Sequence, residues 1–178
     1  DIDGDGICYR TLPGTNHPAA AYFTRGTGHN QAAAYSERPE DWSANLVRLA
    51  KKHDHARTLI PAPIIVHNGT AEVGLIAYGT SDPALQEARD LLQAEGIPSS
   101  YLRLRALPLE SQLTAFIKKH KRLYVVENNL DGQMRALIQL HAPADADRII
   151  SIAKCDGLPL TARWICEAIK AYEAKEQP

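Results

Sequence analysis

From residue 64 onward, short apolar runs alternate with segments that have the apolar spacing of helices, and this alternation constrains the fold most. Runs typical of strands occupy 64–66, 73–78, 100–105, 122–126 and 148–152. The segments between them carry apolar residues three and four positions apart, which is the pattern of a helix with one buried face. Strands separated by such helices imply right-handed crossovers and a mainly parallel sheet covered on both faces. The sequence therefore predicts an α/β domain.

Capping and turn residues mark the borders of several of these elements. Asn68 and Gly69 are a typical turn pair after the first strand. Asp82 is predicted to cap the next helix, with Pro83 as its first residue, because an Asp side chain can accept hydrogen bonds from free helix amides. Thr161 is predicted to cap the last helix in the same way.

The first sixty residues have a different character. Residues 1–38 are rich in Gly, Pro, Thr, Asn and His and poor in aliphatic side chains, so they are expected to form an arm that lies on a partner surface. A helical pattern then begins at Pro39 and ends before the prolines at 61 and 63. We predict an inter-domain arm and helix over 1–62, comprising the end of a preceding domain and a linker, and an α/β domain over 63–178. The chain begins at Asp1 without Met, so we expect it to be a piece of a longer protein.

Composition excludes several classes of function. The 20 basic and 21 acidic residues give a net charge of −1, which produces no strong field toward nucleic acid or a membrane surface. No apolar run is long enough for a bilayer-spanning helix, and no signal peptide opens the chain. The three cysteines are scattered, as expected for structural thiols in a reducing compartment, so a cytoplasmic location is predicted.

A cluster of polar residues directly follows the apolar run at 122–126. Polar groups at the carboxyl end of a buried strand face the crevice where α/β folds bind ligands or partners. Glu127 needs a cation or several amides as partners, because a buried carboxylate without them is costly. The cluster could hold a substrate or a partner subunit, or Asn129 or Asp131 could simply cap the following helix. The candidate contact residues here are Glu127, Asn128, Asn129, Gly132 and Gln133.

A second candidate lies in the arm, where Arg25, Gly26 and His29 form a segment dense in donors and glycine. These residues could contact a ligand or pin the arm to a neighbouring domain, and we favour the second interpretation. A weaker anion-binding candidate is the Thr80-Ser81 pair before the Asp82 helix, which lacks the complete phosphate-binding motifs.

No motif for catalysis, a metal or a cofactor is complete. Residues 1–6 (DIDGDG) copy the first half of an EF-hand calcium loop, but Leu12 stands where the bidentate Glu is required. Gly4-Asp5-Gly6 imitates part of the metal-diphosphate motif of thiamine enzymes, without the strand that must precede it. No nucleophile–base pair is visible among the histidines. We therefore assign no catalytic, cofactor-binding or metal-binding residue to this chain.

Two blocks of sequence carry a resemblance to a known family. The first is 5–14 (DGICYRTLPG) with 22–29 (YFTRGTGH), and the second is 125–129 (VVENN) with Gly132-Gln133 and 154–157 (KCDG). In this order they resemble the C-terminal part of the α subunit of 2-oxoacid:ferredoxin oxidoreductases, most closely the 2-oxoglutarate type. The resemblance extends from about Asp5 to Tyr172.

The resemblance implies a fold like the transketolase C-terminal domain. This is a three-layer α/β/α arrangement with a mainly parallel five-stranded sheet and one antiparallel strand, for which 64–66 is the candidate. It also implies that the complete enzyme decarboxylates a 2-oxoacid with thiamine diphosphate and Mg²⁺. Electrons would pass through an iron–sulfur cluster to ferredoxin, and the acyl group to coenzyme A. The pyrimidine-binding domain would precede Asp1, and the diphosphate-binding domain would lie on the β subunit.

Two hypotheses of function follow. The first is a non-catalytic assembly domain that contacts the β subunit and other domains of the same enzyme and is inactive when isolated. The alternative is a small-ligand module that binds an anion or a coenzyme phosphate at Thr80, Ser81 and Asn128.

Overall fold

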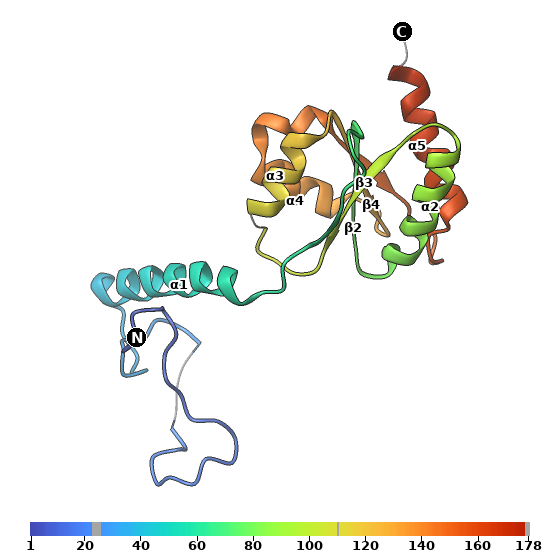
Figure 1. Ribbon diagram of the computed structural model, residues 1–178. Helices are drawn as coiled ribbons and strands as arrows, with labels where there is room; N and C mark the ends of the chain where they lie inside the picture. The colour runs from blue at the N-terminus through green and yellow to red at the C-terminus, as the bar shows by residue number, and fades with distance from the viewer. Residues whose placement is uncertain (23–25, 110, 177–178) are drawn as a thin grey trace. The chain divides into compact units, whose positions relative to one another are not determined.

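The computed structural model describes residues 1–22, 26–109 and 111–176, and the chain divides into two compact units (Figure 1). The first unit is Asp1–Ile60 and the second is Pro61–Pro178. The roles predicted for these two segments, an arm that ends a preceding domain and an α/β domain, stay predictions. None of the helices described is long and apolar enough to cross a membrane.

The second unit contains a five-stranded sheet in the order β1-β3-β2-β4-β5. Its strands are β1 (Ile64–Val66), β2 (Val73–Tyr78), β3 (Ser99–Leu104), β4 (Arg122–Glu127) and β5 (Ile149–Ala153). β1 runs antiparallel to β3, while the pairs β2–β3, β2–β4 and β4–β5 are parallel. This confirms the predicted mainly parallel sheet and the choice of 64–66 as the antiparallel strand.

Helices cover both faces of this sheet, as Figure 1 shows. α2 (Asp82–Ala94) and α5 (Ala162–Glu176) lie on one face, and α3 (Ser111–Lys119) and α4 (Gln133–His141) lie on the other. Two 3₁₀ turns, η1 (Gly79–Ser81) and η2 (Pro143–Arg148), complete the connections. Each face has its own buried apolar cluster, because successive side chains of a strand point to opposite faces. Leu75 and Ala77 of β2 join the cluster under α2 and α5, whereas Ile76 joins the other.

The start of α2 differs from the prediction, because Asp82 does not cap the helix. Asp82 is itself the first residue of the helix, and Ser81, which precedes it, already has right-handed helical backbone angles. Its carboxylate is buried and turns to β3, where it accepts a hydrogen bond from the Tyr101 hydroxyl at 2.7 Å and pairs with Arg103 at 3.0 Å. Burial, and then the bond to Asp82, raise the pKa of Tyr101. Thr161 does cap α5, since its hydroxyl accepts from the Trp164 amide at 3.3 Å.

The first unit consists of the arm and α1 (Pro39–Leu59). No residue of α1 is buried, and its large apolar residues Trp42, Leu46 and Leu49 are 59%, 52% and 46% exposed. The arm approaches the helix at Gly6, whose carbonyl accepts from Arg48 Nη1 at 2.9 Å. A Cβ on Gly6 would lie 2.2 Å from the Lys52 backbone nitrogen, so only glycine fits there.

A partly buried ion pair ties the end of α5 to the start of β4. Arg122 donates to both carboxylate oxygens of Glu173 at 2.7 Å, and the Tyr124 hydroxyl donates to the same carboxylate at 2.5 Å. The neighbouring Lys121 makes a more exposed pair with Glu72 at 2.5 Å. The hydrogen bonds to the Glu173 carboxylate raise the pKa of Arg122.

We expect Arg122→Met to lower the free energy of unfolding by about 3 kcal/mol, because it leaves the Glu173 carboxylate buried without its cation. Lys121→Met is the matched control: it removes the adjacent exposed pair and should leave the stability nearly unchanged. Urea denaturation of both variants measures the difference. Equal losses would contradict this account of the two pairs.

Candidate functional site

The Glu127 side chain lies at the carboxyl end of β4 and is 0% exposed. One carboxylate oxygen accepts from the Met134 amide at 2.8 Å, and the other accepts from the Arg135 amide at 3.1 Å. Both amides belong to the first turn of α4, where they have no partner within the helix. The carboxylate also lies at the positive end of the helix dipole. The prediction was that a cation or several amides would meet Glu127, and the structure shows that amides do.

Asn129 completes this network within the turn between β4 and α4. Its side-chain NH₂ donates to Glu127 at 2.6 Å and to the Tyr78 hydroxyl at 3.2 Å. Its side-chain oxygen accepts from the backbone amides of Gly132 at 2.7 Å and Gln133 at 3.3 Å. Of the two predicted alternatives for a cap, the structure uses Asn129, together with Glu127.

Gly132 permits the turn that brings the helix amides to Glu127. Its φ of +62° is in the left-handed region, which most residues avoid. A Cβ there would lie 2.7 Å from the Ser151 hydroxyl on β5. Glycine is therefore favoured by the backbone angle, and a Cβ would also force the Ser151 side chain to shift.

Other members of the cluster face outward and form a polar rim, which we define as Asn128, Leu130, Asp131 and Gln133. All four are exposed. Asn128 also links this turn to the loop after β5, since its NH₂ donates to the Leu158 carbonyl at 3.2 Å. The rim can offer hydrogen bonds, one negative charge and an apolar contact, and this combination suits contact with another protein.

Thr80 and Ser81 lie at the same edge of the sheet, because they follow β2 and β2 pairs in parallel with β4. Thr80 is exposed, whereas Ser81 is buried. The structure thus brings Thr80 and Asn128 to one edge but gives Ser81 little access to a ligand.

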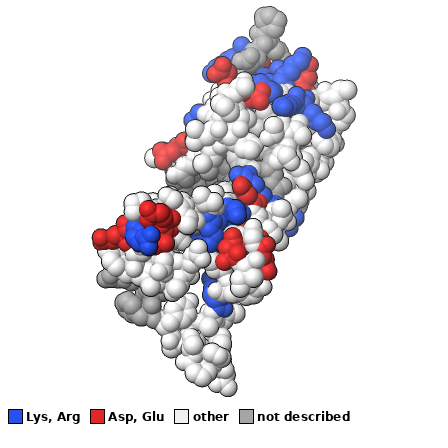
Figure 2. Space-filling view, turned by 90° about the vertical axis from the view of Figure 1, so that its left-hand side faces the viewer, with Lys and Arg blue, Asp and Glu red and all other residues white. Residues whose placement is uncertain are grey.

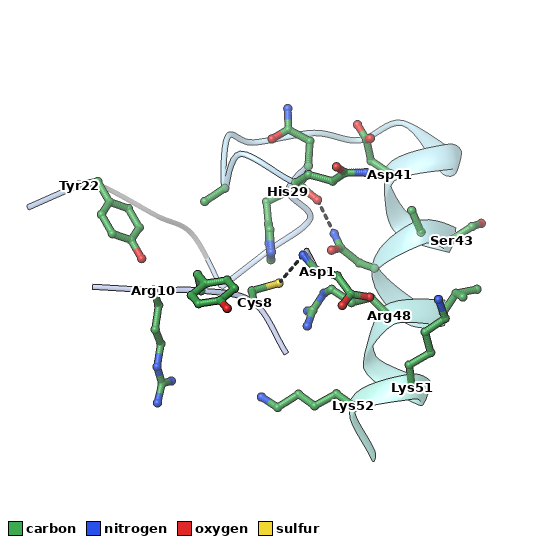
Figure 3. Close-up of a pocket in the computed structure, with 17 residues that line it drawn as sticks. Asp1, Cys8, Arg10, Tyr22, His29, Asp41, Ser43, Arg48, Lys51 and Lys52 are labelled. Carbon is green, nitrogen blue, oxygen red and sulfur yellow. Dashed lines mark hydrogen bonds between the residues drawn. The ribbon is translucent and has the colours of Figure 1, made fainter. Parts of the chain in front are cut away.

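The arm candidates belong to the first unit, where a cavity of about 690 Å³ lies between the arm and α1. Figure 3 shows His29 on the arm and Arg48 on the helix turned toward this cavity. The His29 carbonyl accepts from the Asn45 side chain at 2.5 Å, which pins the arm to α1. Arg25 lies outside the described residues, and a Cβ on Gly26 would meet open space.

Sequence reasoning missed Gly28, the glycine of this segment whose backbone lies close to another part of the chain. A Cβ added at Gly28 would lie 2.6 Å from the Ser36 carbonyl oxygen. The hydrogen bond from the Ser36 amide to the Gly28 carbonyl, 3.1 Å long, is the signal of this local pairing. The run Gly26-Thr27-Gly28 offered two glycines, and the sequence alone did not distinguish them.

The cysteines only partly follow the expectation of structural thiols. Cys166 is buried, and burial raises the pKa of its thiol, but Cys8 and Cys155 are exposed.

In the parts of the chain that the structure describes, no three His, Cys, Asp or Glu side chains form a group able to hold a metal ion. On the face shown in Figure 2, Lys and Arg side chains are interspersed with Asp and Glu.

The strand order, the single antiparallel edge strand and the helices on both faces define a transketolase C-terminal-like α/β domain. A solved structure of a split-gene transketolase shares this fold, with a TM-score of 0.53 and 19% identity over 62% of this chain and 40% of that chain. No family model matches the chain.

Two further proteins are similar to nearly the whole chain. The α subunit of 2-oxoacid:ferredoxin oxidoreductase 2 from Aeropyrum pernix is 26% identical over 175 residues, which cover 96% of this chain and 26% of that protein. The solved 2-oxoglutarate:ferredoxin oxidoreductase from Magnetococcus marinus has a TM-score of 0.76 and 25% identity, covering 94% of this chain and 29% of that chain. The chain is therefore homologous to part of a 2-oxoacid:ferredoxin oxidoreductase α subunit, and the resemblance found in the sequence is confirmed. The chain spans about a quarter of the length of the Aeropyrum pernix protein.

We expect Glu127→Gln to lower the free energy of unfolding of the α/β unit by about 2 kcal/mol. The new NH₂ group would face a backbone amide that needs an acceptor, leaving both buried donors unpaired. Asp131→Asn removes the same charge from the exposed rim and should change the stability little. Thermal and urea unfolding of the two variants provide the comparison, and an equally mild effect of both would refute the buried capping role of Glu127.

Proposed function

We propose that this chain is a non-catalytic assembly domain of the α subunit of a thiamine-dependent 2-oxoacid:ferredoxin oxidoreductase of the 2-oxoglutarate type. The complete enzyme would oxidatively decarboxylate the 2-oxoacid to an acyl-CoA and reduce ferredoxin. Thiamine diphosphate, Mg²⁺ and the iron–sulfur cluster would be held by other domains and by the β subunit. The isolated chain would be inactive.

The observation that carries this proposal is the exposed apolar stripe of α1, which we define as Trp42, Leu46 and Leu49. A helix without a single buried residue gains little stability from its own unit. Three large apolar side chains on one helical face, each about half exposed, are typical of a surface that another protein element covers. The stripe therefore fits a helix that packs against the remainder of a larger assembly.

The polar rim supports the same role on the α/β unit. Glu127 and Asn129 hold the turn in one conformation through bonds within the unit, while the rim residues stay accessible. A preorganised turn loses little conformational entropy on binding, which favours docking of a partner. We propose that Asn128, Leu130, Asp131 and Gln133 make the inter-domain or inter-subunit contact and that Glu127, Asn129 and Gly132 position them. His29 and Gly26 would hold the arm along the same assembly.

The alternative, a ligand module at Thr80, Ser81 and Asn128, is supported by their place at the carboxyl edge of the sheet. Three features weigh against it. The Asn128 amide already donates to Leu158, Ser81 is buried, and the first-turn amides of α4 already bind Glu127. Few free donors remain for an anion at this edge.

Titration calorimetry of the chain with thiamine diphosphate, coenzyme A and 2-oxoglutarate separates the two proposals. We expect no saturable binding that depends on Thr80 or Asn128, because the Asn128 amide and the first-turn amides of α4 are already paired and Ser81 is buried. Asn128→Ala and Thr80→Val are the test variants. Micromolar binding that either change abolishes would favour the ligand module over the assembly domain.

We expect Leu46→Asp in the complete α subunit to reduce recovery of the α–β complex at least about tenfold, because a buried charge at an apolar contact costs more than the 1.4 kcal/mol of one tenfold step. His53→Gln, a change at an exposed position of the same helix, is the control and should assemble normally. Size-exclusion chromatography measures assembly, and circular dichroism checks that the variant keeps its helix content. Normal assembly of a folded Leu46→Asp subunit would contradict the proposal.

A further inference from the structure

A cavity of about 530 Å³ opens at the amino-terminal edge of the sheet, the edge opposite the polar rim. Its walls come from the loop before β2, the start of β3, the end of α3 and the connection from α3 to β4. The volume lies within the range of small-ligand sites. The residues of its wall that matter here are His67, Glu72, Ser100, Lys119, His120 and Lys121.

His120 is the unusual member of this wall. Its side chain is only 4% exposed, and its ring lies against Phe116 with 4.2 Å between ring centroids. Nδ1 lies 2.7 Å from the Phe116 carbonyl oxygen. A carbonyl can only accept, so Nδ1 carries the proton, and Nε2 of the neutral ring is an acceptor. Within the described parts of the chain, no hydrogen-bond partner meets Nε2.

The surrounding fold holds the imidazole in a fixed position. Gly74 on β2 makes room for it, since a Cβ at that position would lie 2.9 Å from His120 Cγ and 2.9 Å from a Phe116 ring carbon. The Arg148 guanidinium donates a hydrogen bond to the His120 carbonyl. These contacts fix the imidazole ring, so Nε2 is a preorganised hydrogen-bond acceptor at the wall of the cavity.

The charges near His120 are mostly positive. Burial lowers the pKa of His120, and smaller contributions in the same direction come from His67 on the β1–β2 loop, Lys119 on α3 and Arg148 on η2. At neutral pH the ring is consequently uncharged. Arg148 is paired with Asp145.

The lysines at this edge differ in their pairing. Lys121 is paired with Glu72, but Lys119 has no carboxylate partner in the ranges that the structure describes. Lys118 and Lys119 both suit the negative end of the α3 dipole, yet only Lys119 lines the cavity. The helix dipole explains a lysine at this position, but it does not explain why the acceptor His120 Nε2 and the Lys119 cation line the same cavity without partners of their own.

We propose that this cavity binds an oxyanion that also carries a hydrogen-bond donor, with hydrogenphosphate as the simplest ligand. The negative oxygens would meet Lys119 and His67, and the P–OH group would donate to His120 Nε2. Ser100 is buried at the cavity wall, and its Oγ already accepts from the Asn68 amide at 3.2 Å. Its hydroxyl proton is therefore left to donate to a phosphate oxygen.

This arrangement predicts selectivity among anions of similar size. Sulfate and the dianion of a phosphomonoester such as methyl phosphate have no proton to donate at pH 8, so the neutral imidazole would repel their oxygens. Hydrogenphosphate retains its proton there. Below the lowered pKa of His120 the protonated ring becomes a donor, and sulfate should then gain affinity.

Calorimetric titration of the chain with these three anions at pH 8, and with phosphate and sulfate over a series of lower pH values, tests the proposal. We expect hydrogenphosphate to bind at least about tenfold more tightly than sulfate at pH 8, as for the gain or loss of one charge-assisted hydrogen bond. The preference should shrink once the pH falls below the lowered pKa of His120. Lys119→Ala should weaken phosphate binding about tenfold, whereas Lys118→Ala, its neighbour on the same helix, should not.

His120→Phe keeps the aromatic contact with Phe116 and removes the acceptor, so it should abolish the preference for phosphate over sulfate. If this variant fails to fold, the Lys119 and Lys118 pair decides the matter alone. No saturable phosphate binding, equal affinity for sulfate and phosphate at pH 8, or equal effects of the two lysine changes would each overturn the proposal. Methyl phosphate that binds more tightly than phosphate at pH 8 would also overturn it.

Discussion

The carboxylate of Glu127, buried against the first turn of α4, is the interaction on which the arrangement of the α/β unit depends. It couples the end of the central strand to the start of a helix on the other side of a tight turn. A buried carboxylate is stable only while the helix amides and Asn129 surround it, so moving these donors away would leave a buried charge without partners. The same bonds satisfy amides that the helix leaves unpaired.

This constraint determines what the carboxyl edge of the sheet presents to other molecules. In many α/β domains a helix N-terminus at this edge binds a ligand anion. Here Glu127, a group of the chain itself, occupies that position. The edge therefore presents a rigid turn with exposed side chains rather than a set of free donors, and such a surface fits a protein partner better than a phosphate.

Much of the fold could be predicted because period-two and helical apolar patterns report burial directly, as for the strands at 73–78 and 122–126. Details that depend on contacts between residues far apart in the sequence could not be predicted. Asp82 has the sequence context of a cap, but Tyr101 and Arg103 lie 19 and 21 positions further along the chain and bind its carboxylate instead. The need for partners at Glu127 was predictable from its place after an apolar strand.

The two edges of the sheet also divide the possible functions between them. At the carboxyl edge the Glu127 carboxylate and the Asn129 amide are paired within the unit, so binding there would use the exposed rim residues. At the amino-terminal edge His120 keeps one ring nitrogen unpaired beside a lysine, and its charge state responds to pH near its lowered pKa. An anion bound at the amino-terminal edge would stabilise the α/β unit by mass action.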